Sequence, residues 1–318
     1  MDEAERLFEQ GIKAIEEGDT ARARKIGRRL IRMRYSGGYE LEARAWREDE
    51  RLDKAVEVLQ EGVKVAPQAW LLWHWLGSCL SDSGYFAEAR EAFGRGLTVR
   101  GAPRGSMRYN IASTLHREQR FEVALNVLEE CAADCLGDAR LWAHHQALKL
   151  LLLTTLERYE EALSLSERLT QSGEADPLAD VQGEVLGCRA IALLKGRRLR
   201  EEAMVSAWRA LHHDTRNTRA LRVIRELAGQ ISEAGQYFKM MIEGRWHQEV
   251  DQPGEVPSFY CVYFVVADSS EEALALLARH EPEAVRASLR IDRAEVVERR
   301  PGALKGVYDR TGRIFHID

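Results

Sequence analysis

The sequence predicts an α-helical solenoid of about six helix-turn-helix repeats with a capping helix, followed by a small α+β domain. Alanines recur behind charged or glycine-containing turns, at Ala23, Ala55, Ala89, Ala124, Ala162 and Ala203. Their intervals of 32, 34, 35, 38 and 41 residues fit a repeat of about 34 residues with small loop insertions. Beyond Gly235 the pattern changes to segments rich in aromatic and β-branched residues, which are typical of strands.

Composition and charge limit the classes of function. The 318 residues, 45% of them hydrophobic, suffice for two folded domains. The net charge of −5 comes from acidic and basic side chains mixed throughout, so no overall field attracts nucleic acid or anionic lipid. The five cysteines are scattered and odd in number, which favours a reducing cytoplasm. The acidic start is a poor secretion signal, and the apolar run 148–156 is far shorter than the roughly 20 residues of a membrane span. We expect a cytoplasmic protein.

The third repeat carries the clearest motif. Its residues are Trp73, Leu76, Gly77 and Leu80 on a first helix, Gly84 and Phe86 at the turn, and Ala89 and Phe93 on a second helix. Small Gly77 and Ala89 would let the two helices approach closely, while Trp73 and Phe93 fill the space beside them. The motif resembles the tetratricopeptide repeat, W-x2-L-G-x2-Y followed by A-x3-F and a proline. Leu80 replaces the tyrosine, and Pro103 comes slightly late. The resemblance covers about residues 4–232.

The other repeats keep the same phase. A large residue stands three before the alanine in the second, fourth and fifth copies, at Leu52, Phe121 and Tyr159, and Thr20 takes that place in the first. In the sixth copy Leu199 lies four before Ala203, which indicates an insertion. The fifth copy is stretched, so we expect its first helix to be longer. Apolar residues at 221, 224, 227 and 231 predict a capping helix over 218–231. The helical domain is therefore predicted at 1–233.

The remaining residues, 234–318, predict a domain in the order β-β-α-β-β. Asp268 to Glu272 provide a helix start with a capping hydroxyl, and Pro282 limits that helix. In the segment 306–317, Asp309 to Gly312 separate two runs of large side chains, which predicts a hairpin. We expect a sheet that one helix covers on one face. This domain resembles no family that we recognise.

Residues that could carry chemistry are few. Cys131 and Cys135 share one helical face, but zinc needs about four ligands, and no further histidine or cysteine lies within a turn. They are interpreted as core residues. The doublets His144-His145 and His212-His213 point about 100° apart and cannot form a clamp on one helix. The motifs of serine hydrolases, nucleotide-binding loops and zinc proteases are absent. We expect no catalytic residues, no metal and no other cofactor.

One helix carries a dense run of positive charge. Its members are Arg22, Arg24, Lys25, Arg28, Arg29, Arg32 and Arg34. They could grip an acidic partner, or form a solvated face that meets Glu9, Glu16 and Glu17 of the preceding helix. A second basic turn spans Lys195 to Arg200. Without interleaved aromatic residues, neither tract favours a nucleic-acid site.

The resemblance implies that the first helices of successive repeats line a concave groove. The residues off their packing face are Glu40, Arg44 and Arg47 in the second repeat, His74, Ser78 and Asp82 in the third, and Tyr109, Ser113, His116 and Arg117 in the fourth. Some family members bind a C-terminal carboxylate through Lys, Asn and Arg at fixed positions, and the first three repeats show no such set. A segment of mixed charge fits better, with Tyr109 as anchor. Trp70 and Trp75 could be core, groove or inter-repeat contacts.

Two functional hypotheses follow. The first is a non-catalytic scaffold or adaptor that binds a protein segment in its groove, such as a dedicated inhibitor, an immunity protein or a chaperone. The alternative is a ligand-binding or enzymatic C-terminal domain that the solenoid regulates. A pocket with convergent polar groups near Tyr260, Tyr263, Arg290 or His316 would favour the alternative. The partner's identity and the oligomeric state stay open.

Overall fold

The structure is a computed structural model that describes residues 2–172, 178–245 and 258–316. The chain forms two compact units, Met1–Leu152 and Leu153–Asp318. The sequence boundary at residue 233, which separates helical repeats from strands, remains a prediction. Among the described residues no helix is both long and apolar enough to cross a membrane.

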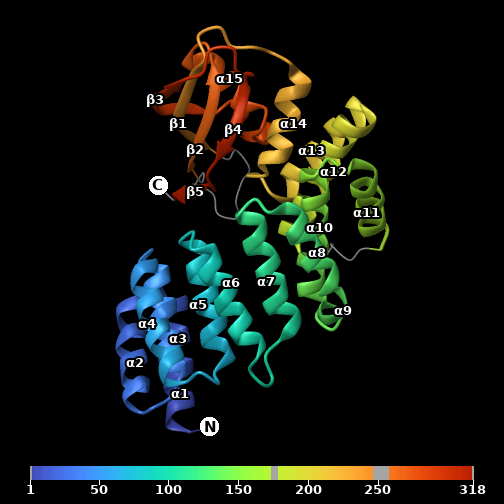
Figure 1. The fold of residues 1–318 in the computed structure, drawn as a ribbon. Coiled ribbons are helices and arrows are strands. Elements are labelled where there is room, and N and C mark those ends of the chain that lie inside the picture. The colour runs from blue at the N-terminus through green and yellow to red at the C-terminus, as the bar shows by residue number, and fades with distance from the viewer. Residues whose placement is uncertain (1, 173–177, 246–257, 317–318) are drawn as a thin grey trace. The chain divides into compact units, whose positions relative to one another are not determined.

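The first unit consists of helices that pack in sequence order (Figure 1). They are α1 (Glu3–Glu16), α2 (Thr20–Arg32), α3 (Gly37–Glu48), α4 (Leu52–Val65), α5 (Trp70–Asp82), α6 (Phe86–Leu97), α7 (Arg104–Arg117), α8 (Phe121–Glu130) and the short α9 (Ala132–Cys135). Helix α10 (Ala139–Thr155) crosses into the second unit. First helices also neighbour one another, since α3 contacts α1 and α5, and α5 contacts α7. A row of first helices is what places the predicted groove residues side by side.

The predicted repeat phase is confirmed by burial. All six alanines, from Ala23 to Ala203, are 0% exposed. In all six copies the residue three before the alanine is the first residue of the second helix, and in the sixth copy this residue is Arg200. The close approach at Gly77 is also confirmed, because a Cβ atom there would lie 2.7 Å from the ring of Phe93. Small residues thus set the distance between paired helices, and the large ring fills the space that they leave.

Each turn inside a repeat contains one residue with positive φ, five positions before the alanine. These residues are Gly18, Glu50, Gly84, Gln119, Glu157 and Arg198. Only two of the six residues are glycine, so the left-handed position cannot be recognised from the residue type. It can be recognised from its fixed distance of five residues before each alanine. A left-handed residue at this point reverses the chain between the two helices.

The second unit continues with α11 (Tyr159–Ser172), α12 (Ala179–Ala192), a π-helical turn η1 (Leu193–Arg197), α13 (Arg200–His213) and α14 (Thr218–Ala228). The π-helical turn η1 lies just before the left-handed residue Arg198. From Arg198 to Ala203 the sixth repeat keeps the spacing of the other repeats, so the predicted insertion does not lie in that stretch. The prediction of a longer first helix in the fifth repeat is confirmed, since α10 has 17 residues and α5 has 13. Helix α14 occupies the predicted cap and packs on α12, α13 and strand β4.

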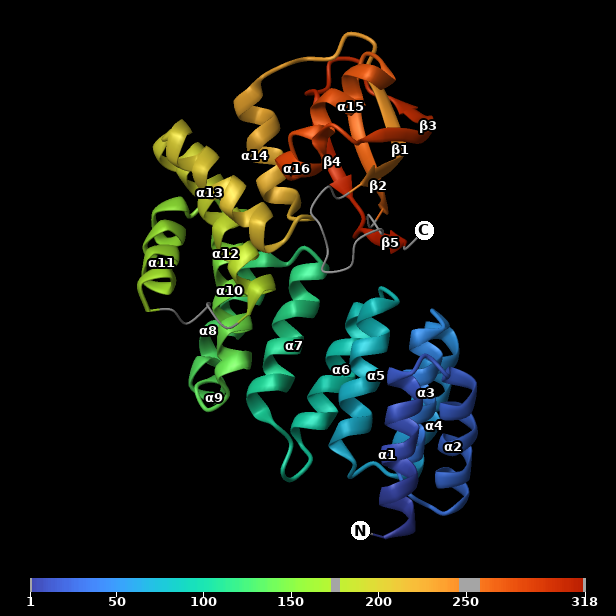
Figure 2. The same ribbon diagram turned by 180° about the vertical axis from the view of Figure 1, so that it is seen from behind.

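The sheet of the second unit is antiparallel, with the order β3-β1-β2-β4 and with β5 also on β2 (Figure 2). Its strands are β1 (Gln236–Arg245), β2 (Ser258–Ala267), β3 (Arg290–Arg299), β4 (Gly306–Arg310) and β5 (Ile314–His316). Helix α15 (Ser270–Ala278) starts at the predicted cap, where the Ser269 hydroxyl accepts the Glu272 backbone N–H, and packs on β2, β3 and β4. A short α16 (Glu283–Arg286) follows Pro282. The predicted element order is thus present, with an added strand and an added helical turn.

The predicted hairpin over 306–317 was wrong for the residues that the structure describes. Strands β4 and β5 pair with β2, one after the other, instead of with each other. Between them the Thr311 backbone N–H donates to the Val262 carbonyl at 2.8 Å, and the Thr311 hydroxyl accepts the Val262 N–H at 3.0 Å. Asp309 and Arg310 belong to β4, and Arg310 is anchored by a buried carboxylate described below. A turn would pull Arg310 away from that partner.

Candidate functional site

Three charged side chains meet on the first helices of repeats two to four. Asp82 on α5 accepts from Arg47 on α3 at 3.0 Å and from Arg117 on α7 at 2.7 Å. The arginine side chains are 42% and 41% exposed, so each keeps donors that face solvent. One carboxylate between two guanidinium groups leaves a local charge of +1, and the donors left over suit an incoming carboxylate or carbonyl oxygen.

These side chains lie at the edge of a pocket of about 240 Å³ within the first unit. Its lining is polar with two aromatic rings and consists of Arg47, His74, Trp75, Ser78, Ser81, Asp82, Phe93, Asn110, Ser113, Thr114 and Arg117. His74 Nε2 lies 2.9 Å from the Asn110 amide nitrogen. Burial, and then the nearby positive Arg47, lower the pKa of His74 below its usual value. A neutral His74 can accept from Asn110 through Nε2, which leaves the proton on Nδ1.

Buried hydroxyl groups of α5 and α7 form hydrogen bonds with each other beneath the pocket. Thr114 on α7 donates to the Asn110 carbonyl at 2.8 Å and lies 3.3 Å from the Ser81 hydroxyl of α5. Ser81 also accepts from Arg117 at 3.2 Å. The contacts join α5 to α7, so the Arg117 guanidinium is held by two acceptors before any partner arrives.

Six of the ten predicted groove residues line this pocket, namely Arg47, His74, Ser78, Asp82, Ser113 and Arg117. Glu40 is buried at 5% exposure, and Arg44 donates to it at 3.3 Å. Burial raises the pKa of Glu40, although the charge of Arg44 acts in the opposite direction. Tyr109 and His116 do not line the pocket, and His116 packs on Phe121 with ring centroids 5.7 Å apart.

Sequence reasoning missed Asn110, Ser81 and Thr114 as lining residues, placed Phe93 only in the core, and left Trp75 open between core, groove and inter-repeat contact. A signal for Asn110 was present, since it precedes Ser113 by three and Arg117 by seven residues, which is one helical face. Tyr109 is displaced from that face by one position. Trp70, Trp73 and Trp75 all pack against the core cluster, and the Trp73 indole donates to the Pro67 carbonyl at 2.9 Å. Trp75 faces the groove, where Arg44 and Arg47 lie over its ring.

The basic face of α2 is largely paired within the first unit. Arg22 pairs with Glu17, Arg29 with Glu3, Arg28 with Glu42 and Arg24 with Asp49. Of the predicted acids Glu9, Glu16 and Glu17, Glu17 is one of these partners. The other three, Glu3, Glu42 and Asp49, were not predicted. The solvated-face interpretation therefore explains most of this run, and its acids belong to two neighbouring helices.

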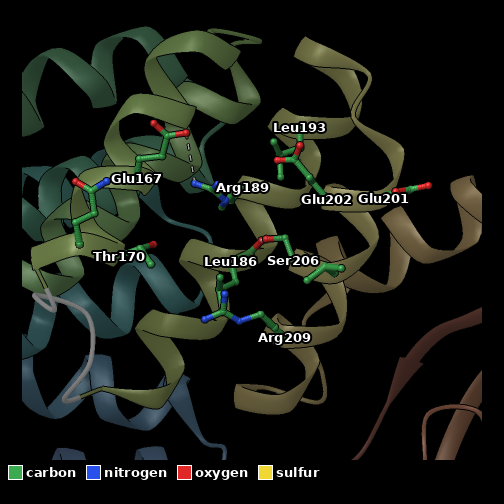
Figure 3. Close-up of a pocket in the computed structure, with 11 residues that line it drawn as sticks. Glu167, Thr170, Leu186, Arg189, Leu193, Glu201, Glu202, Ser206 and Arg209 are labelled. Carbon is green, nitrogen blue, oxygen red and sulfur yellow. Dashed lines mark hydrogen bonds and ion pairs between the residues drawn. The ribbon is translucent and has the colours of Figure 1, made fainter.

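A larger pocket, of about 490 Å³, lies within the second unit (Figure 3). Second helices α11 and α13 and the intervening α12 line it, with Arg189 pointing toward Glu167 at 3.8 Å and Arg209 lying across from them. Its charge is mixed, because Glu201 and Glu202 also line it. The expectation of a groove along first helices did not point to this pocket.

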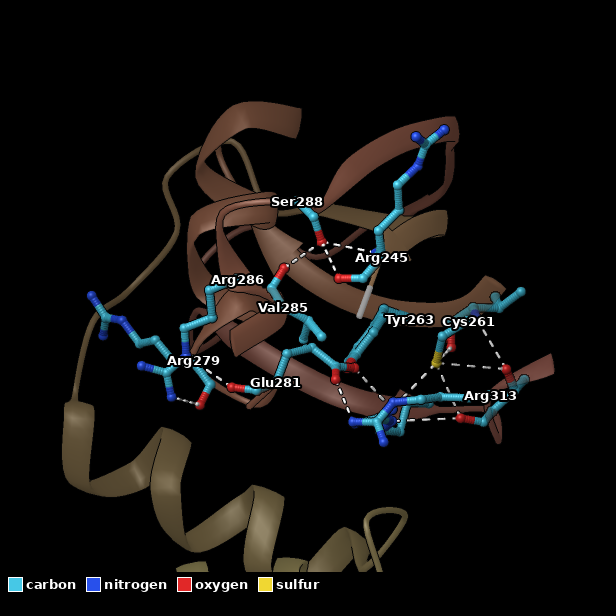
Figure 4. A network of polar contacts seen from close by, with 12 residues as sticks. Arg245, Cys261, Tyr263, Arg279, Glu281, Val285, Arg286, Ser288 and Arg313 are labelled. Carbon is cyan, nitrogen blue, oxygen red and sulfur yellow. Dashed lines mark hydrogen bonds and ion pairs between the residues drawn. The ribbon is translucent and has the colours of Figure 1, made fainter. Parts of the chain in front are cut away.

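The C-terminal sheet contains a buried polar network (Figure 4). The Glu281 side chain is 0% exposed and accepts from Arg310 at 3.0 Å, from Arg313 and from the Tyr263 hydroxyl. Burial, and then the charge of Glu281, raise the pKa of Tyr263 far above its usual range. This network links β2, β4 and the segment before α16 in the interior of the C-terminal α+β domain, which is called the module below. A pocket of about 150 Å³ beside it is lined by Trp208, Arg225 and His280 among others, and by none of the four residues proposed for a C-terminal site.

The cysteine pair has a third neighbour that the sequence did not reveal. Cys131, Cys135 and His145 are all buried, and a ligand atom of each lies within 4.8 Å of the other two. The sequence search considered only residues within a turn of the pair, whereas His145 reaches the pair from the next helix, α10. Burial raises the pKa of Cys131 to about 12, and the neighbouring Cys135 acts in the same direction.

Comparisons with known proteins support the helical fold. The tetratricopeptide-repeat family model matches residues 72–102, which span most of α5 and α6, and no family model matches the C-terminal domain. A structure reported as the functional characterization of Pseudomonas aeruginosa pilF aligns with a TM-score of 0.56 at 12% identity, over 70% of this chain and 97% of that chain. The Cut9–Hcn1 hetero-tetramer of the APC/C aligns with a TM-score of 0.56 at 13% identity, over 70% of this chain and 42% of that chain. No curated protein matches the sequence. The tetratricopeptide resemblance is thereby confirmed as a likeness of fold.

Proposed function

We propose that this chain, a tetratricopeptide-repeat solenoid joined to a small α+β module, is a non-catalytic protein-interaction scaffold. The site that we assign to binding is the pocket across α3, α5 and α7. The observation that carries the proposal is the arginine pair Arg47 and Arg117, held by Asp82 at 3.0 and 2.7 Å with donors still facing solvent. A dedicated inhibitor, immunity protein or chaperone is a narrower version of the same proposal.

The chemistry of the pocket favours a protein segment with an acidic side chain. Two arginines offer charge-assisted hydrogen bonds, while Trp75 offers apolar surface beside them. Asn110 and Ser78 are suited to the backbone of an extended or helical segment. Binding of such a segment requires no catalytic side chain, because the arginine, asparagine and serine side chains of the pocket act only as hydrogen-bonding partners. The cytoplasm remains the proposed location.

The proposal is tested by selection from a peptide-display library with the full chain, followed by calorimetry on the enriched peptides. We expect peptides that carry a carboxylate, and a loss of affinity of about 10- to 100-fold for Arg47→Ala or Arg117→Ala, the value of a hydrogen bond to a charged group. Arg95→Ala, on the exposed surface of α6, is the matched control and should leave affinity unchanged. Enriched peptides that bind both pocket variants as well as the wild type would place recognition elsewhere.

A further inference from the structure

The buried cluster of Cys131, Cys135 and His145 lies apart from the lining of the proposed binding pocket. We propose that these three side chains form a structural metal site that binds one zinc ion per chain. Its ligand atoms are the two Sγ atoms and Nε2 of His145, because Nδ1 faces the Gln146 amide at 3.3 Å. The proposal does not depend on the function assigned to the groove.

The spacing of the donor atoms is close to what zinc requires. The three ligand atoms lie within 4.8 Å of one another. Tetrahedral zinc, with bonds of about 2.3 Å to sulfur and about 2.0 Å to nitrogen, needs donors about 3.4–3.8 Å apart. A contraction of about 1.4 Å at most reaches that geometry, and the short break between α8 and α9 at Cys131 is where it can occur.

A fourth ligand is available from the backbone. The Leu128 carbonyl oxygen lies 3.3 Å from Cys131 Sγ and 2.8 Å from His145 Nε2, and accepts hydrogen bonds from both. On zinc binding the two thiols release two protons, and the Nε2 proton of His145 moves to Nδ1. The carbonyl oxygen then loses both donors and can serve as the fourth ligand after it moves about 0.5 Å away from Nε2, since nitrogen and oxygen ligands of tetrahedral zinc lie about 3.3 Å apart.

The residues around His145 hold its ring in place. Trp142 stacks on it with centroids 5.1 Å apart and planes 14° apart. When Nδ1 carries the proton, a half-turn of the Gln146 amide presents its oxygen as the acceptor. Such an outer partner commonly fixes the tautomer of a metal-binding histidine.

The donor set selects the ion. Thiolate sulfur and imidazole nitrogen together are preferred by zinc and by copper, whereas magnesium and calcium prefer oxygen. All three side chains are at most 1% exposed, which describes a closed structural site with no open position for substrate. Such an ion joins the end of α8 and α9 to the first turns of α10, across the connection between the fourth and fifth repeats.

The test uses the untagged full chain, freed of metal by a chelator under reducing conditions. Zinc affinity is measured by competition with a chromophoric chelator, and cobalt(II) serves as the spectroscopic probe. We expect one ion per chain and a thiolate-to-cobalt charge-transfer band. Affinity should fall by at least about 100-fold for Cys131→Ala or Cys135→Ala, and by about 10-fold for Gln146→Ala. Cys79→Ala, an equally buried cysteine of the same unit, is the control and should retain wild-type affinity.

The cobalt spectrum of the wild-type protein decides the proposal even if a cysteine variant does not fold. Absence of the thiolate band, or wild-type zinc affinity in a folded Cys131→Ala/Cys135→Ala double variant, overturns it. Tight binding of copper(I) with no competition by zinc overturns the assignment of zinc.

Discussion

The helical repeats and the C-terminal sheet place their charged side chains differently. In the repeats, Asp82 and its two arginines lie at a surface pocket, with the Asp82 side chain 28% exposed. In the module, Glu281 and Arg310 have side chains that are 0% and 2% exposed. Water screens the first cluster and not the second, so an ion pair contributes little in the repeats while the removal of one partner is costly in the module. Packing of small residues holds the repeats together, whereas the module depends on one buried network.

The largest effect should follow from breaking that network. We expect Glu281→Gln to lower the free energy of unfolding by about 3–5 kcal/mol, because Arg310 would remain buried without its counter-charge. Urea denaturation followed by circular dichroism measures it. Glu283→Gln, the same change at an exposed site two residues away, should cost less than about 0.5 kcal/mol. For the repeats, Asp82→Asn should cost about 1 kcal/mol or less. Similar losses for Glu281→Gln and Asp82→Asn would contradict the contrast.

Acid should also affect the module through His280. Its ring packs on Trp208 with centroids 5.1 Å apart. Burial, assisted by the charges of Arg310, Arg225 and Arg279, lowers the pKa of His280 from its ordinary value of 6.5 to about 4. The unfolded chain therefore binds this proton more readily, and the stabilisation present above pH 6.5 is lost as pH falls toward 4.

We expect the shift at His280 to remove about 2–3 kcal/mol of stability between pH 7.5 and 4.5. The measurement compares urea denaturation at both pH values for the wild type and His280→Phe, which keeps an aromatic ring against Trp208. The variant should lose this part of the pH dependence. An equal loss of unfolding free energy between the two pH values in both proteins would show that His280 does not cause the pH dependence.

Packing in the repeats can be tested with two glycines of the same helix pair. A Cβ atom at Gly77 would lie 2.7 Å from Phe93, whereas one at Gly94 of α6 meets nothing within 4 Å. Gly77→Ala should therefore destabilise by about 1–3 kcal/mol through overpacking. Gly94→Ala should stabilise by about 0.5–1 kcal/mol, since alanine favours a helix. Thermal denaturation should move in opposite directions for the two variants, and a shift in the same direction would refute the packing argument.

The same contrast explains how much the sequence predicted. Contacts in the repeats recur at a fixed spacing, so Ala23 to Ala203 predicted the helices, their pairing and six lining residues of the pocket. The choice of Tyr109 over Asn110 failed because it was one residue out of helical phase. The hairpin at 309–312 failed because Arg310 is bound by Glu281, 29 residues away. His145 was missed for the same reason, since its partners lie on another helix.

The smallest effect concerns the turns of the repeats. Glu50 and Gly84 occupy equivalent turns with φ of 59° and 83°, and a left-handed backbone costs a side-chain-bearing residue about 1 kcal/mol more than glycine. We expect Glu50→Gly to raise the free energy of unfolding by about 0.5 kcal/mol, because part of that strain is offset by the greater freedom of glycine in the unfolded chain. Gly84→Ala should lower it by about 1 kcal/mol, although its Cβ would meet no atom within 4 Å. The melting temperatures of Glu50→Gly and Gly84→Ala, compared with that of the wild type, measure the two effects. Because the six turns are equivalent, Gln119→Gly should match Glu50→Gly, and a loss of stability in both would show that their side chains, and not the backbone, determine the turn.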